Sequence, residues 1–240
     1  MEFRDWQNSE DYASGTGLSG DQWAWEFLRR NSGYQAEWSD FNRIWQALEA
    51  VYGRPPDRDF CAWKADPRAW VAVADCPDSD CRVDQDKVLI ECAMGARWGF
   101  YKFPPDPADD DPCGAGRLAW REIEQDIPVV GSDDRQWLGN DAARVALGFD
   151  LSLPLREQIE RAKRSLQILQ RQRRKAGRIE MSSLKTQCAS LGLMLRLLDA
   201  EADAADATAF ASVSPDWGVL LDQAHMLRDG GYRRLPLLPA

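Results

Sequence analysis

Basic side chains are concentrated in one stretch of the 240-residue chain, between Arg156 and Arg178. The stretch holds nine Lys/Arg and two Asp/Glu, a local charge of +7, whereas the formal charge of the whole chain is −9. Guanidinium and ammonium groups at this density are suited to bind the phosphates of a nucleic acid or an acidic protein surface. The alternative interpretation is a solvated helix face that binds nothing.

The candidate phosphate-contacting residues fall in two parts of the sequence. Most belong to the basic stretch, and three lie near the end of the chain. They are Arg156, Lys163, Arg164, Arg171, Arg174, Lys175, Arg178, Arg228, Arg233 and Arg234. If six to eight of them contact DNA, bound counterions are released and the affinity should fall steeply as salt is added.

The cysteines are the other residues whose spacing could support chemistry. Cys76 and Cys81 form one closely spaced pair, and Cys92 and Cys113 follow singly. A structural zinc site normally uses two such pairs, and the only histidine, His225, is remote in sequence. We therefore expect reduced, inert thiols and neither a metal nor a cofactor.

Residue patterns typical of enzymes are missing from the sequence. It has no P-loop, no GxGxxG after a predicted strand and no GxSxG motif. A catalytic His would have to be His225, which falls on a predicted helix. The acidic run 104–116 lacks the ligand spacing of a calcium loop, so we interpret it as a solvated surface loop. The sequence predicts a protein that is not an enzyme.

An amphipathic helix over 152–177 is predicted to position the basic residues. Its apolar positions are spaced by four and three residues, and most of the cations fall on the opposite side. The apolar positions are Leu155, Ile159, Ala162, Leu166 and Leu169. Ser152 is the expected N-cap, Pro154 suits the first turn and Gly177 the stop. The stripe fits either core packing or a parallel pairing of helices.

Helices and a small antiparallel sheet are predicted in the first 150 residues. Helical patterns cover 21–30, with Asp21 as candidate N-cap, and 39–52. Three short β-branched or aromatic runs predict strands, with a tight turn at 94–96. The strand runs are 69–75, 86–92 and 97–103.

Tryptophan is unusually frequent in the same part of the chain. Ten of the eleven tryptophans precede residue 150, and we expect them to fill the core of that region rather than to stack on bases. Weaker helical patterns occur near 119–124 and 141–147.

The last part of the chain is predicted to be entirely helical. A strongly apolar helix covers 181–199, and Asp206 is expected to cap a short helix that reaches Phe210. A final helix covers 216–229 and ends at two glycines. The short helix, the turn and the final helix fit a helix-turn-helix.

Charge divides the chain near Asp150. Residues 1–150 carry 16 Lys/Arg and 29 Asp/Glu, a charge of −13, whereas residues 151–240 carry 14 and 10, a charge of +4. This change of sign predicts a domain boundary. No secretory signal pattern and no apolar run long enough to span a bilayer is present, so we expect a cytoplasmic protein without a membrane partner.

Several sequence motifs resemble one group of proteobacterial mobile-element proteins. WAWEFLRRN (23–31) with Tyr34 resembles their N-terminal transcriptional regulator-like domain, and RWGFYKFPPDP (97–107) with Trp120 resembles the stretch that follows it. Three further motifs resemble their C-terminal RovC-like DNA-binding domain. These are FDLSLPLREQIERAKRSLQ (149–167), LRLLDA (195–200) and LRDGGYRRL (227–235).

The resemblance implies an α+β protein with two domains. Residues 1–150 would be the acidic, Trp-rich regulator-like domain, with N-terminal helices and a small antiparallel sheet. Residues 151–240 would be an all-α, helix-turn-helix-like domain in which Gln223, His225 and Arg228 read bases. The implied function is transcription regulation, of the activator type, at type VI secretion or mobile-element genes.

The expected partners are double-stranded DNA, a second copy of the chain in a homo-oligomer, and a protein bound through the acidic N-terminal domain. A hypothesis of another class is a protein-binding regulator, such as an antiactivator, that has this fold but does not bind DNA. In a third, the acidic half of the chain masks the basic half until a partner releases it.

Overall fold

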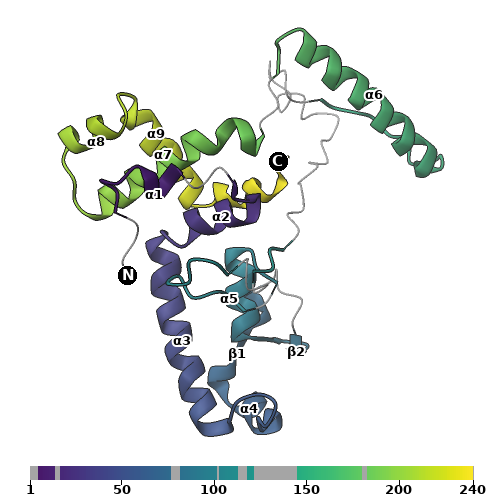
Figure 1. Ribbon diagram of the computed structural model, residues 1–240. Helices are drawn as coiled ribbons and strands as arrows, with labels where there is room; N and C mark the ends of the chain where they lie inside the picture. Colours follow the sequence, from purple (N-terminus) through teal and green to yellow (C-terminus); the bar gives the residue numbers. More distant parts are fainter. Residues whose placement is uncertain are drawn as a thin grey trace. The chain divides into compact units, whose positions relative to one another are not determined.

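The computed structural model describes residues 5–13, 17–76, 82–101, 103–112, 118–121, 145–179 and 183–239 (Figure 1). The chain divides into two compact units, each considered by itself below. Unit 1 consists of Met1–Ile123 together with Ser183–Ala240, and unit 2 consists of Glu124–Ser182. The fold is α+β, as predicted, because helices dominate and one small antiparallel sheet accompanies them.

Unit 1 begins with four helices. They are α1 (Glu10–Ala13), α2 (Gly20–Leu28), α3 (Ser32–Tyr52) and α4 (Phe60–Ala65). The two predicted helices are confirmed, but both begin elsewhere. Ser19, and not Asp21, caps α2, because Ser19 and Gln22 form a reciprocal capping box. Asn31 caps α3 by accepting from the Tyr34 N–H, so α3 starts seven residues before the predicted position.

The sheet has three short strands in the order β1-β3-β2, and both pairings are antiparallel. The strands are β1 (Trp70–Ala72), β2 (Arg82–Asp84) and β3 (Lys87–Leu89). Two of the three predicted strand runs contain β1 and β3, whereas β2 was not predicted. Two 3-10 turns flank β1, at Pro67–Ala69 and Val73–Asp75.

The predicted turn at 94–96 is wrong, because helix α5 (Ile90–Trp98) takes its place. The predicted strand over 97–103 is also wrong, because α5 includes its first two residues and, of the described remainder, only Phe100 makes a β-bridge. Every residue from Ile90 to Ala96 is buried, so the run shows no one-sided helical pattern and reads equally well as a buried strand. Gly99 ends the helix with φ +89°, a conformation that glycine adopts without a Cβ penalty. Phe100 then forms an isolated bridge with Trp120.

The C-terminal part of unit 1 contains the three predicted helices and a final 3-10 segment. They are α7 (Leu184–Ala202), α8 (Ala207–Val213), α9 (Trp217–Arg228) and η5 (Gly231–Leu237). Asp206 caps α8 as predicted, by accepting from the Ala209 N–H at 2.9 Å. The turn between α8 and α9 comprises residues 214–216, a length found in helix-turn-helix motifs.

One core joins the two ends of the chain. Trp23, Phe27 and Leu28 of α2 are buried with Leu195 of α7 and Tyr232 of η5. Trp23, Trp25 and Trp63 are buried, as expected, whereas Trp6, Trp38, Trp98 and Trp120 are only partly buried. The core that holds Trp23 and Trp25 is not confined to the first 150 residues, because α7, α9 and η5 contribute to it.

Gly20 lets the start of α2 approach η5 very closely. A Cβ at this position would lie 2.4 Å from the Leu235 carbonyl oxygen and 2.8 Å from the Pro236 Cα. Any larger residue would therefore push α2 and η5 apart.

Three sequence-based expectations concern segments between these elements. The helical pattern at 119–124 is wrong as far as Arg121, because Phe100 pairs with Trp120 there. Most of 141–147 lies outside the described residues, and its described end, 145–147, is not helical. The boundary predicted at residue 150 coincides with neither unit's limits, since unit 1 takes residues from both sides.

Candidate nucleic-acid interface

The predicted basic helix is present in unit 2 as α6 (Leu155–Lys175). None of its residues is buried, and the basic residues of its last turn oppose the negative end of the helix dipole. Gly177 follows with φ +64°, consistent with the predicted stop.

The segment before α6 is fastened to its first turn by side-chain hydrogen bonds. The Gln158 amide donates to the Asp150 carbonyl oxygen and accepts from the Asp150 N–H, each at 2.9 Å. Ser152 is not the N-cap, because its hydroxyl donates to the Asp150 carboxylate at 2.6 Å and Pro154 occupies the cap position. The Ser152 hydroxyl lowers the pKa of Asp150, because its hydrogen bond stabilises the carboxylate.

The candidate phosphate-binding side chains of unit 2 are all exposed. They are Arg156, Lys163, Arg164, Arg171, Arg174, Lys175 and Arg178. Within the described part of the chain, none of them forms an ion pair with a carboxylate. Most of them lie on the helix side opposite the apolar stripe. The helix therefore presents a cationic face available to an anionic partner.

The three other candidates lie in unit 1, and two of them are already engaged. Arg228 donates to both oxygens of Asp229, at 2.8 and 2.9 Å, and approaches a Glu201 oxygen at 3.6 Å. The hydrogen bond with Asp229 raises the pKa of Arg228 and lowers that of Asp229. Arg233 donates to the Arg97 carbonyl oxygen, whereas Arg234 is exposed.

The base-reading residues expected on α9 are therefore constrained. His225 Nε2 lies 2.8 Å from the same Glu201 oxygen that Arg228 approaches. Gln223 is exposed beside Asp222, whose negative charge opposes a phosphate backbone.

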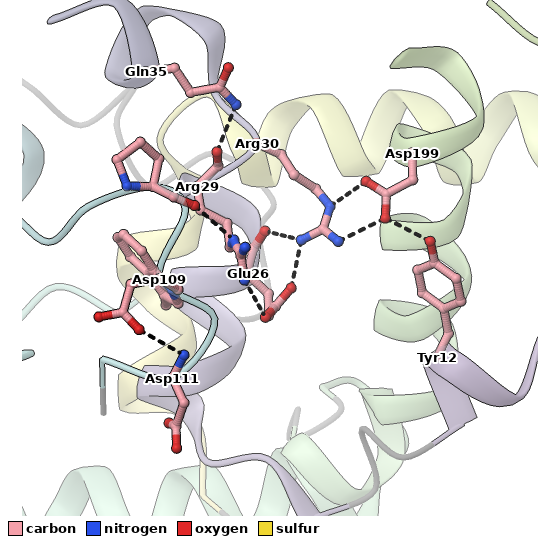
Figure 2. Close-up of polar contacts among 10 residues, drawn as sticks. Tyr12, Glu26, Arg29, Arg30, Gln35, Asp109, Asp111 and Asp199 are labelled. Carbon is pink, nitrogen blue, oxygen red and sulfur yellow. Dashed lines mark hydrogen bonds and ion pairs between the residues drawn. The ribbon is translucent and has the colours of Figure 1, made fainter. Parts of the chain in front are cut away.

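A buried ion-pair network fixes α2 against α7 (Figure 2). Arg30 donates to both oxygens of Asp199, at 2.6 and 2.7 Å, and to Glu26 Oε2 at 2.6 Å. The Tyr12 hydroxyl donates to Asp199 at 2.7 Å. Burial lowers the pKa of Arg30, but the hydrogen bonds and charges of Asp199 and Glu26 outweigh this effect and raise it. This network was not anticipated from the sequence, although Glu26 and Arg30 stand four residues apart in the helix predicted over 21–30.

In its described part, the predicted acidic loop is exposed at Asp106, Asp110 and Asp111, half-buried at Asp109, and anchored through its backbone. Three side chains from α2, its C-cap and α3 donate to loop carbonyls. Trp25 donates to Asp109 at 2.8 Å, Arg29 to Pro107 at 3.1 Å and Tyr34 to Pro105 at 2.5 Å. Burial raises the pKa of Tyr34, so the hydroxyl stays a donor. Carbonyl acceptors leave no sequence signature, which is why this anchoring was missed.

The cysteine pair considered for zinc is only partly described. Cys76 and Cys92 are buried in one cluster with Val88 and Ala93, whereas Cys81 and Cys113 lie outside the described residues. Among the residues whose placement is described, no group of three potential metal ligands comes together.

Comparison with known proteins identifies one region of the chain. Residues 5–70 match a family model. The family is the proteobacterial transcriptional regulator-like domain. The matched region contains α1 to α4 and ends at the first residue of β1. The match supports a role in the regulation of transcription.

The rest of the chain, including α6 to α9, lies outside that match. No curated protein and no solved structure matches the chain. Among the described helices, none has the length and apolar character required to cross a membrane.

Proposed function

We propose that the chain is a DNA-binding transcription regulator that contacts phosphates through the cationic face of α6. The observation that carries the proposal is the set of exposed, unpaired basic side chains on this helix, in a chain whose N-terminal region matches a regulator-like domain. An α-helix of 21 residues is about 30 Å long, which is close to one turn of duplex DNA.

Phosphate contact, rather than base reading, is the role we assign to the described residues. Arg228 and His225 are held by Glu201 and Asp229, so α9 has few free donors for base edges. Sequence specificity would then come from DNA shape or from an additional partner. From the resemblance above, we propose activation of type VI secretion or mobile-element genes, in the cytoplasm.

The test is fluorescence anisotropy with a mixed-sequence duplex of about 30 base pairs, about three helical turns, titrated at several salt concentrations. We expect the affinity to fall on the order of a thousandfold between 50 and 200 mM salt. The triple variant Arg171→Ala, Arg174→Ala, Lys175→Ala should weaken binding to all sequences and lower the slope against log salt by about 2 to 3.

A matched control removes the same charge from exposed positions of unit 1. It is the triple variant Arg43→Ala, Arg54→Ala, Lys64→Ala. This variant should bind like the unsubstituted protein. Equal losses in the two triple variants would show that only net charge matters and would contradict a role for α6.

A protein-binding regulator of the same fold, such as an antiactivator, is the second candidate. The engagement of Arg228 and the overall charge of −9 favour it. Absence of duplex binding even at low salt would support this candidate over the first.

A further inference from the structure

We propose that α6 pairs with the α6 of a second copy of this chain, in parallel and in register, when both copies bind a duplex. This inference rests on the proposed function and adds the partner that covers the apolar side of the helix. It starts from the exposure of that side. Leu155, Ile159 and Leu166 are 45%, 53% and 38% exposed.

The spacing of the stripe indicates that its partner is another helix. Its five apolar positions alternate by four and three residues, which is the repeat of a two-stranded coiled coil and not that of a helix on a flat surface. In the heptad notation abcdefg, Ile159 and Leu166 occupy a. Leu155, Ala162 and Leu169 occupy d. The next a position is Arg173, which ends the stripe.

The residues beside the stripe favour the helix's own copy, in one orientation. Parallel pairing places each g residue beside an e residue of the next heptad in the other chain. Gln158 then meets Lys163, and Ser165 meets Gln170, so no like charges face each other beside the stripe; the one like-charge contact is beyond it, where Arg173 at position a meets its own copy. Antiparallel pairing about Ala162 would instead set Lys163 against Lys163.

Other helices of the chain are poor candidates for this position. The apolar residues of α2 and α7 are already buried in the core of unit 1. On α9, the exposed Val219 and Met226 are separated by Asp222 and Gln223, so its described surface has no continuous apolar stripe.

Duplex DNA promotes the pairing because it removes the main opposing force. Each helix brings a charge of +7 over Arg156–Arg178, and four large apolar residues form only a short seam. Phosphates that bind the cationic faces neutralise this repulsion. The parallel orientation also brings the basic C-terminal ends of the two helices together, which adds to the repulsion that the phosphates neutralise.

The first experiment measures the mass of the full-length protein by sedimentation velocity, with and without the duplex. The stripe variant is Ile159→Ser with Leu166→Ser. The control, Leu153→Ser with Ile168→Ser, removes the same residue types from exposed positions outside the stripe, 56% and 55% exposed. The unsubstituted and control proteins should bind as two copies, and the stripe variant as one, with an affinity lower by about a hundredfold.

The second experiment tests the orientation by oxidative cross-linking on the duplex. Leu166→Cys should give a covalent dimer above the level of the unsubstituted protein, because residue 166 faces itself across the seam. Ile168→Cys should not. A single copy per duplex, equal behaviour of stripe and control variants, or no cross-link at residue 166 would each overturn the proposal. If no variant binds DNA but the stripe substitutions abolish a dimer that forms without it, the proposed function and the role of the duplex in pairing both fail, and only the contact between the two α6 helices stands.

Discussion

Arg30 pairs with two carboxylates at once inside the core of unit 1, and Arg29, which also pairs with Glu26, supplies the second positive charge. Its side chain is 4% exposed, and those of Glu26 and Asp199 are 5% and 2% exposed. Charges removed from water this completely are tolerated only because each has a close partner. The network therefore requires α1, α2 and α7 to be folded together, because each contributes one of its charged or hydrogen-bonding side chains.

Removal of Arg30 should strongly destabilise the protein. Arg30→Met leaves Asp199 with Tyr12, and Glu26 with Arg29, as remaining partners. We expect a loss of about 3–5 kcal/mol in the free energy of unfolding, measured by urea denaturation. Arg43→Met, at an exposed ion pair with Asp40, should change it by less than about 1 kcal/mol. Equal stability of the two variants would contradict a structural role for the network.

At the residue level, the sequence predicted the cationic side chains but not their partners. The basic residues of α6 were found by counting charge, because a helix brings neighbours in sequence to one surface. Arg228 was predicted equally well as a DNA contact, yet it is engaged by the adjacent Asp229, whose effect was overlooked, and it approaches Glu201, which lies 27 positions earlier in sequence. Such pairs depend on tertiary packing, which no local pattern contains.

Elements with a one-sided apolar pattern were predicted well, and elements without one were not. The stripe of α6 and the caps of α8 are local signals. By contrast, α5 is buried on every side, so its position depends on what packs around it. The first turns of α3 contain Gly33 but also Tyr34 and Trp38, which continue the stripe of Phe41, so the earlier start of this helix had a local signal that was missed.

The two helices considered for DNA contact should respond differently to substitution. Arg228→Ala should leave duplex affinity within about twofold, because Asp229 and Glu201 already compensate its charge. The triple α6 variant should lose far more in the same anisotropy assay. A loss from Arg228→Ala comparable to that of the triple variant would show that the guanidinium exchanges its carboxylates for phosphate, and would restore α9 as a recognition helix.

At the scale of the whole molecule, unit 1 is assembled from both ends of the chain. The matched region, 5–70, contributes α2, whose buried face is completed by α7 and η5 from beyond residue 183. Unit 2 is an insertion between these two parts. The change in charge predicted a boundary at residue 150 because charge was counted along the sequence. A unit built from two separate segments has no single boundary that such a count could find.

Replacing Glu124–Ser182 with a flexible Gly/Ser linker of about 20 residues should therefore leave unit 1 folded. We expect one cooperative unfolding transition by circular dichroism, with duplex binding lost together with α6. A fragment of residues 151–240 should fail to fold cooperatively, because it leaves Asp199 and the apolar side of α7 without α2. A stable fragment with native helix content would refute this interdependence.

The distance in sequence between Arg30 and Asp199 also has a consequence during synthesis. The two residues are 169 positions apart. At usual rates of elongation, Asp199 is added on the order of 10–30 seconds after Arg30. During that interval Arg30 has Glu26 but not Asp199 as its partner, and the buried face of α2 lacks α7. The regulator-like region can therefore close its core only after α7 and η5, which ends at Leu237, have been synthesised.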